Sequence, residues 1–301
     1  MKHITTIHAP AETVQSIISE AENWPIFFAP TIACEQKCSD QEDELSLWAR
    51  EGELDSVVCW RSVRQFSVDG CHITFRQVEP VPPLTEMAGT WTVHKLDERT
   101  TELTLSHTLA AADEDALCSA RAATDYNSTA ELAGIKTLAE TYGSVLSEHI
   151  VRTHDEVWID APVHDVFTPL WDVSRWPDLL THVDAVTVHS RGKNQHRFSM
   201  TLGSTANHVH TVESVRIAHP DQWVAFKQIK TPAGVYGHAG TWTLEESDGR
   251  TCVTVRHLAL LERNEDVPLQ DLVTRLRSNL SRSSLSTLTA IERLAASEAK
   301  S

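Results

Sequence analysis

The order of apolar and polar positions predicts a strand, a helix and then a series of strands in the first half of the chain. Residues 2–8 form a short strand, and the apolar positions of 9–18 recur at helical spacing after Pro10, which suits a first helical turn. Further strands are predicted where short alternating runs are separated by turn residues, at about 44–50, 55–66, 71–79, 88–96 and 101–110. A long helical pattern over 113–142 follows, so the unit belongs to the α+β class.

The second half of the chain repeats this pattern, ending in a second helical stretch at 268–296. Three motifs recur in the same order at separations of 151 or 152 residues, namely HAPAETV and DAPVHDV (8–14, 160–166), SVR (62–64, 214–216) and AGTWT (88–92, 239–243). Because order and spacing agree, the sequence predicts two homologous domains, 1–148 and 149–301.

Composition and charge narrow the class of protein. The net charge of −16 over 301 residues makes nucleic acid an unexpected partner, because phosphate binding needs a basic surface. Residues 1–150 contain 10 Lys and Arg against 24 Asp and Glu, whereas residues 151–301 contain 16 against 18, so an acidic partner meets less repulsion from the second half. No apolar run approaches the ~18–20 residues of a membrane-spanning helix.

Cofactor and metal chemistry have no sequence support. The six cysteines lack a paired metal-binding spacing, and no Gly-rich phosphate loop is present. The N-terminus has no apolar signal segment. We therefore expect reduced thiols, a cytoplasmic location, no membrane association, no metal and no cofactor.

The predicted strand VCWRSVRQF at 58–66 carries the first candidate site. Alternation puts four residues on one face: Trp60, Ser62, Arg64 and Phe66. A permanent cation on an otherwise apolar face is costly to desolvate. The arginine therefore either lines a cavity that needs a positive charge, or pairs with an acid or reaches solvent.

The corresponding strand of the second half differs in chemistry. The face that holds Ser214 and Arg216 also holds His208, His210 and Val212. Histidine titrates near pH ~6.5, so His210 is a candidate for proton transfer. Tyr236 and His238 precede the second AGTWT motif and are expected to line the same space.

The series A-P-x-x-x-V, W-P, W-x-S-x-R, a Trp-bearing strand and a long C-terminal helix resembles the START-like helix-grip superfamily. Within it, the chain resembles the two-domain bacterial aromatic (type II) polyketide aromatase/cyclases. The resemblance implies two tandem helix-grip domains, each a curved antiparallel sheet wrapped around a long C-terminal helix with an internal cavity. It also implies regiospecific first-ring aldol cyclisation, dehydration to the aromatic ring, or both, on a poly-β-ketone bound to an acyl carrier protein, with other type II polyketide synthase components as partners.

The resemblance carries the family's pocket arginine to Arg64 and its serine to Ser62. The resemblance places a family pocket tyrosine at Thr31 and Val183 and a second pocket arginine at Gln77, so this chain lacks a phenol and that arginine at these positions. The predicted catalytic residues are Arg64, Ser62, Arg216, Ser214 and His210. The predicted substrate-binding residues are Trp24, Trp60, Phe66, Trp91, Trp176, His208, Tyr236, His238 and Trp242.

Several alternatives stay open at this point. The chain could be a non-catalytic binding or transport protein for a hydrophobic or aromatic ligand, although plain carriage does not need a buried charge. The tryptophans at 24, 91, 176 and 242 could anchor the fold instead of contacting substrate. Asn127 and Asn279, on the two long helices, could face the cavity or solvent. One hypothesis assigns ring closure to the first domain, with its larger aromatic wall, and dehydration to the second.

Overall fold

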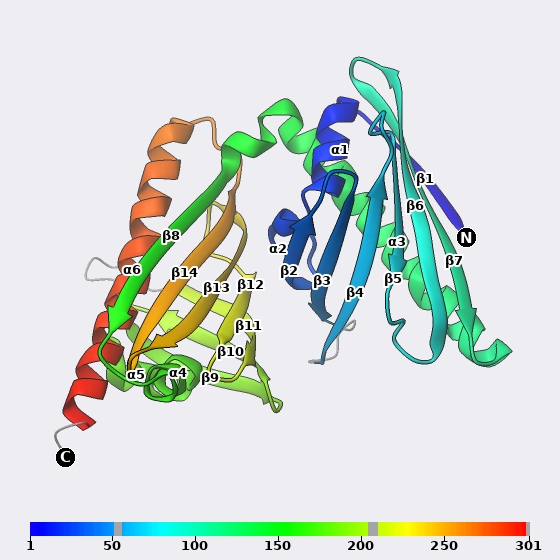
Figure 1. Cartoon of the computed structure of the whole chain (residues 1–301). Coiled ribbons are helices and arrows are strands. Elements are labelled where there is room, and N and C mark those ends of the chain that lie inside the picture. The colour runs from blue at the N-terminus through cyan, green and yellow to red at the C-terminus, as the bar shows by residue number, and fades with distance from the viewer. Residues whose placement is uncertain (51–55, 204–209, 299–301) are drawn as a thin grey trace. The chain divides into compact units, whose positions relative to one another are not determined.

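The computed structural model describes residues 1–50, 56–203 and 210–298. The chain divides into two compact units, with residues 1–49 and 58–148 in the first and residues 149–298 in the second. Each is built from a seven-stranded antiparallel sheet and one long helix (Figure 1). The predicted α+β class with two tandem helix-grip units is thus confirmed. In the described part of the chain, no helix is long and apolar enough to cross a membrane.

The sheet of the first unit has the order β1-β7-β6-β5-β4-β3-β2. Its strands are β1 (Lys2–Ile7), β2 (Thr31–Cys38), β3 (Glu42–Arg50), β4 (Val57–Phe66), β5 (His72–Gln77), β6 (Leu84–Asp97) and β7 (Thr100–Ala111). Its helical segments are α1 (Ala11–Ser19), η1 (Ala21–Asn23), α2 (Trp24–Phe27), α3 (Glu114–Tyr142) and η2 (Gly143–His149). Strand β2 was not predicted, because its three buried residues come together at its start and do not alternate with polar ones.

The second unit repeats this order as β8-β14-β13-β12-β11-β10-β9. Its strands are β8 (Ile150–Ile159), β9 (Val183–Arg191), β10 (Gln195–Leu202), β11 (His210–His219), β12 (Trp223–Lys230), β13 (Val235–Ser247) and β14 (Arg250–Leu261). Its helical segments are α4 (Val163–Trp171), η3 (Val173–Arg175), α5 (Trp176–Leu179) and α6 (Leu269–Glu298).

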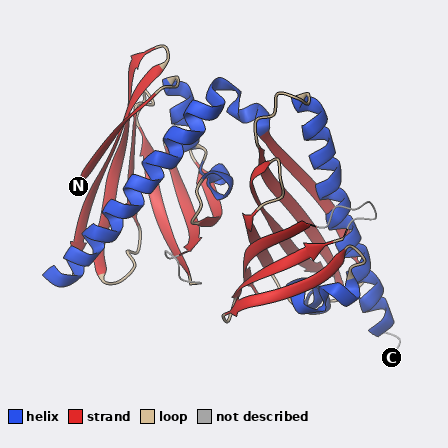
Figure 2. Cartoon of the chain, turned by 180° about the vertical axis from the view of Figure 1, so that it is seen from behind, coloured by secondary structure: helices blue, strands red, loops and turns tan. Residues whose placement is uncertain are grey.

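The long helix of each unit lies against the sheet (Figure 2), and α3 has capping residues at both ends. The Asp113 side chain accepts a hydrogen bond from the Ala116 amide at 2.7 Å, which caps α3, and Glu114 and Asp115 add negative charge to its first turn. Gly143, at a φ of 54°, ends the helix in a conformation that favours glycine.

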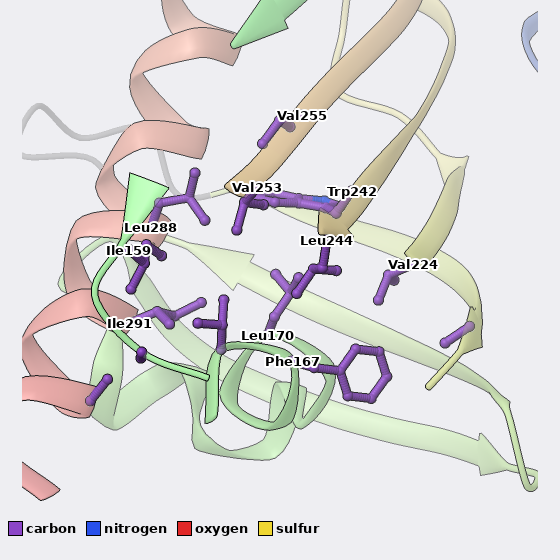
Figure 3. Packing of buried hydrophobic residues seen from close by; sticks show 14 residues of the cluster. Ile159, Phe167, Leu170, Val224, Trp242, Leu244, Val253, Val255, Leu288 and Ile291 are labelled. Carbon is purple, nitrogen blue, oxygen red and sulfur yellow. The ribbon is translucent and has the colours of Figure 1, made fainter. Parts of the chain in front are cut away.

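Apolar side chains fill the space between the sheet of the second unit and its helices. Val253 and Trp242 from the sheet meet Leu170 from α4 and Leu288 and Ile291 from α6 (Figure 3). Trp242 is therefore part of this core, which is the fold-anchor role that the sequence left open. The packing fixes one face of α6 toward the sheet, so the polar residues on that face are also buried.

Candidate functional site

Strand β4 has the alternation that the sequence predicts, whereas on β11 every residue from Ser214 to Ala218 is buried. On β4, Ser62 and Arg64 are buried and Trp60 and Phe66 are half-buried, while the intervening Arg61 is exposed. On β11, Val212, Ser214 and Arg216 are all buried. Each of these two strands therefore holds a buried arginine.

In the first unit, Arg64 is fully engaged in a buried ion pair. It is 2% exposed, and its Nε and Nη2 donate to the two carboxylate oxygens of Asp43 at 2.9 and 2.5 Å. Nη1 and Nη2 also donate to the carbonyls of Ile18 and Ser19 at the end of α1, both at 2.7 Å. Gln36 donates to the same carboxylate at 2.6 Å. This is the pairing with a strand acid that the sequence analysis left open.

In the second unit, Arg216 is equally buried but lacks such a partner. Its Nη1 donates to the carbonyl of Leu170 at 2.9 Å, the repeat of the Ile18 contact. Among the described residues, its Nη2 has no hydrogen-bond partner. Burial lowers the pKa of Arg216 to about 9, so the guanidinium remains charged at neutral pH.

The difference between the two arginines comes from one position on the neighbouring strand. His196 pairs with Arg216 in the β10–β11 register, where the first unit has Asp43 beside Arg64. His196 is buried, and its Nε2 also has no partner among the described residues. Burial, with the charges of Arg216 and Arg191, lowers the pKa of His196 to about 3, so this neighbour is neutral. Gln36, which donates to Asp43, also has an apolar counterpart in the second unit. Gln36 pairs with Leu45 in the first unit, and Val188 pairs with Phe198 at the same register position in the second.

Aromatic rings flank both guanidinium groups. The Arg64 Cζ lies 5.3 Å from the ring centre of Trp24 and 5.1 Å from that of Phe66. The Arg216 Cζ lies 5.1 Å from Trp176 and 5.8 Å from Trp171. Trp171 thus reaches the second guanidinium group from α4. The larger aromatic wall expected of the first unit, through Trp60, stays a prediction.

Trp24 and Trp176 also anchor the fold. Their indole Nε1 atoms donate to the carbonyls of Ile17 and Pro169 at 3.0 and 3.1 Å, which ties each W-P segment to the preceding helix. The same two rings thus hold the helix end and contact the arginine. Trp91 is buried as well.

Each unit places a glutamine beside its serine on the adjacent strand. Ser62 pairs with Gln77 and Ser214 with Gln228 in the strand register. The Oε1 atoms of Gln77 and Gln228 are buried without a hydrogen-bond partner among the described residues. The repeat therefore conserves an amide acceptor at the position where the family resemblance suggested an arginine.

The second unit contains a chain of three buried hydrogen-bonding side chains. The Nε2 of His238 lies 3.0 Å from the Nδ1 of His257, and the Nε2 of His257 lies 2.7 Å from the Ser284 hydroxyl on α6. Burial lowers the pKa of His257 to about 4, and burial together with His257 lowers that of His238 further, so both rings are neutral. Phe226 packs edge-on against both rings.

The first unit has a reduced version of this chain. His107 lies 3.5 Å from the Ser128 hydroxyl, the limit of a hydrogen bond, and Met87 stands two residues before Gly89 where His238 stands two before Gly240. Burial, together with the charges of His3 and the N-terminus, lowers the pKa of His107 to about 4. Half-buried Glu131, one turn further along α3, has its pKa raised by burial to about 7.

Other predicted residues lie elsewhere. His210 is exposed at the first residue of β11, and Tyr236 is 41% exposed. His208 lies outside the described residues. Asn127 and Asn279 are exposed, so they lie on the solvated sides of their helices. The catalytic and substrate-binding roles that the sequence predicts for His208, His210 and Tyr236 stay predictions. The internal cavity expected in each unit also stays a prediction.

Two further observations concern metal binding and surface pockets in the described part of the chain. Within residues 1–50, 56–203 and 210–298, no three His, Cys, Asp or Glu side chains gather as a metal site would require. A surface pocket of 280 Å³ is lined by Trp158, Ser247, Asp248 and Arg250, none of which was predicted to act in the site.

Sequence reasoning missed Asp43, His196, Ser284 and Glu131. Asp43 and His196 lie 153 residues apart, just outside the motifs that align at 152, so only the strand register reveals that they correspond. Ser284 and Glu131 are ordinary polar residues in a helical pattern, and their burial depends on the rotation of each helix against its sheet.

Comparisons with known proteins give the family. Residues 159–278 match the model of the family described as "Polyketide cyclase / dehydrase and lipid transport". The granaticin polyketide synthase bifunctional cyclase/dehydratase of Streptomyces violaceoruber is 30% identical over 95% of this chain and 91% of that protein. The actinorhodin polyketide synthase bifunctional cyclase/dehydratase of Streptomyces coelicolor is 31% identical over 95% of this chain and 93% of its own length.

A solved structure agrees with this similarity over both units. The di-domain ARO/CYC BexL from the BE-7585A biosynthetic pathway is 29% identical, matches 98% of each chain and gives a TM-score of 0.78. The chain therefore belongs to the family of polyketide synthase bifunctional cyclase/dehydratases, and it is an aromatase/cyclase of aromatic polyketide biosynthesis.

Proposed function

We propose that the chain acts on a poly-β-ketone tethered to an acyl carrier protein, closing the first ring by an aldol reaction and removing water to make that ring aromatic. The aldol step requires an enolate, which needs fixed donors near its oxygen. It also requires a flexible chain to be held in one shape, an effect that can lower a barrier by as much as ~7–11 kcal/mol. Ser62 with Gln77, and Ser214 with Gln228, supply neutral polar contacts for such a chain in the two units.

The single observation that carries the dehydration step is the chain His238–His257–Ser284. Dehydration breaks a C–H bond and a C–O bond, forms a C=C bond, and releases hydroxide that must gain a proton to leave as water. A chain of neutral hydrogen-bonded groups can accept a proton at one end and release one at the other, without leaving an isolated buried charge. His238 Nε2 to His257 Nδ1 at 3.0 Å, and His257 Nε2 to Ser284 Oγ at 2.7 Å, have the lengths that such transfer needs.

The test is His238→Met, which introduces the residue that the first unit has at Met87. Reconstitution with a minimal polyketide synthase, with and without a ketoreductase, should yield cyclised but non-aromatised material by mass spectrometry. His219→Ala, at an exposed position on β11, is the matched histidine control and should leave the aromatic product unchanged. His210→Ala tests the catalytic role that the sequence predicts for that residue. Full aromatisation by the His238 variant would refute the proposed transfer path, and loss of aromatisation only in the His210 variant would assign the proton transfer to that residue.

The partner proposal is that an acidic acyl carrier protein docks on the second unit. Exposed Arg275, Arg277 and Arg282 along α6 support it, as does the smaller excess of acidic residues in this half. Crosslinking that maps the carrier protein only to residues 1–148 would contradict the proposal.

We also propose a cytoplasmic location. The six cysteines all lie in the described residues and are all free, which is consistent with a reducing compartment.

A further inference from the structure

The second unit holds a buried cation for which the described residues supply no counter-charge. Arg216 is 1% exposed and His196 is 3% exposed, and each carries one nitrogen without a hydrogen-bond partner, Nη2 and Nε2 respectively. An unpaired buried charge is costly unless something compensates it. The described residues around Arg216 therefore leave its charge and one of its hydrogen-bond donors without a partner.

The first unit shows what completes this arrangement. There, the carboxylate of Asp43 occupies the side of the guanidinium that His196 borders in the second unit, and it receives hydrogen bonds from Nε and Nη2 of Arg64 and from Gln36. The contact that pins the arginine to the preceding helix is shared, through the carbonyls of Ile18 and Leu170. The two units therefore share the hydrogen bond from the arginine to the preceding helix, and they differ in the carboxylate that pairs with the arginine.

We propose that Arg216 and His196 form an oxyanion site that takes the enolate or phenolate oxygen of a planar polyketide ring, and that the first unit lacks this site because Asp43 occupies it. Arg216 donates from Nη2, and the Nε2–H tautomer of His196 donates a second hydrogen bond. The inference rests on the proposed function, which supplies an oxygen anion of this kind. Trp171, Trp176 and His196 add flat faces around the donors, with the rings of Trp171 and His196 centred 4.1 Å apart.

Binding can be tested without turnover. The probe is 1-hydroxy-2-naphthoate, a planar aromatic ring that carries one carboxylate, titrated into the full chain by calorimetry. We expect one site per chain, lost in Arg216→Met and in His196→Asp, and kept in His219→Asp, which adds the same charge at an exposed position on β11. Two sites per chain, or binding that survives both Arg216→Met and His196→Asp, would overturn the proposal.

His196→Asp also separates a binding role from a structural one. The new carboxylate recreates the Asp43 arrangement, so the thermal unfolding temperature should rise, while the rate of aromatic product formation should fall about 10²–10³-fold, as for loss of an oxyanion donor. A stabilised variant with unchanged probe binding and unchanged product would show that Arg216 is only structural. If the probe binds through Arg216 but neither variant alters the polyketide products, the anion site stands and the proposed function fails.

Discussion

The two buried arginines should respond very differently to the same substitution. Arg64→Met leaves the carboxylate of Asp43 buried with Gln36 as its remaining side-chain donor. Removing one partner of a buried ion pair costs about 3–5 kcal/mol, because the other charge stays uncompensated. Arg216→Met instead removes a charge that has one hydrogen bond, to the Leu170 carbonyl. Replacing such a charge with an apolar side chain of similar shape should be neutral or stabilising.

Thermal unfolding and hydrogen exchange together measure this difference. A cost of 3–5 kcal/mol in a unit of this size corresponds to a fall in unfolding temperature of roughly 6–20 °C. Hydrogen exchange by mass spectrometry assigns the loss to a unit, because peptides from β4 should lose protection in Arg64→Met while those from β11 keep it in Arg216→Met. The double variant Arg64→Met with Asp43→Leu should recover most of the loss, since exchanging a whole buried pair for apolar side chains is often neutral.

Similar falls in unfolding temperature for Arg64→Met and Arg216→Met would refute this reasoning. That result would mean that the charge of Arg216 is compensated within the folded protein itself. A double variant no more stable than Arg64→Met would separately contradict the explanation by an unpaired Asp43.

The remaining predictions concern pH, glycine positions and the unit boundary. The pKa of His257 is about 4 in the folded state against an ordinary 6.5, so the folded state binds fewer protons than the unfolded state between these two pH values. Stability therefore falls as the pH drops from 6.5 toward 4, by up to ~1.4 kcal/mol per pH unit. His257→Gln should flatten this pH dependence, measured by urea unfolding. Glu131, with its pKa raised to about 7, destabilises the fold increasingly as pH rises from 4.5 to 7, so Glu131→Gln should raise the unfolding temperature at pH 8 and leave it unchanged at pH 4. Gly240→Ala brings a Cβ to 2.6 Å from the Phe226 ring and should lower the free energy of unfolding by ~1–3 kcal/mol. Gly134→Ala, whose Cβ would have no atom closer than 3.8 Å, should stabilise α3 by ~0.5–1 kcal/mol. Equal effects of the two substitutions in chemical denaturation would contradict the packing argument. Residues 1–148 expressed alone should unfold cooperatively by circular dichroism, and a fragment without cooperative unfolding would contradict the proposed boundary.

The sequence by itself determined the repeat, the class of each unit and the inward faces of β4 and β11. These features follow from local periods, because a strand alternates every two residues and a helix repeats every 3.6, whatever lies across from it. The long helices were predicted at 113–142 and 268–296 and are found at Glu114–Tyr142 and Leu269–Glu298. The buried Ser62–Arg64 and Ser214–Arg216 pairs follow from the same alternation.

Only the tertiary structure decided what those buried groups meet. Arg64 reaches Asp43 across 21 residues and Ile18 across 46, separations set by strand pairing and helix packing that no local period encodes. The helices show the same limit, since alignment at 152 residues pairs Asn127 with Asn279, while the residues that meet His107 and His257 are Ser128 and Ser284, 156 residues apart. A shift of two residues on a strand, or of one turn on a helix, keeps the same face buried and so fits the same sequence pattern. It changes which side chain stands beside the charge, and so decides whether a buried arginine is already paired or still needs an anion.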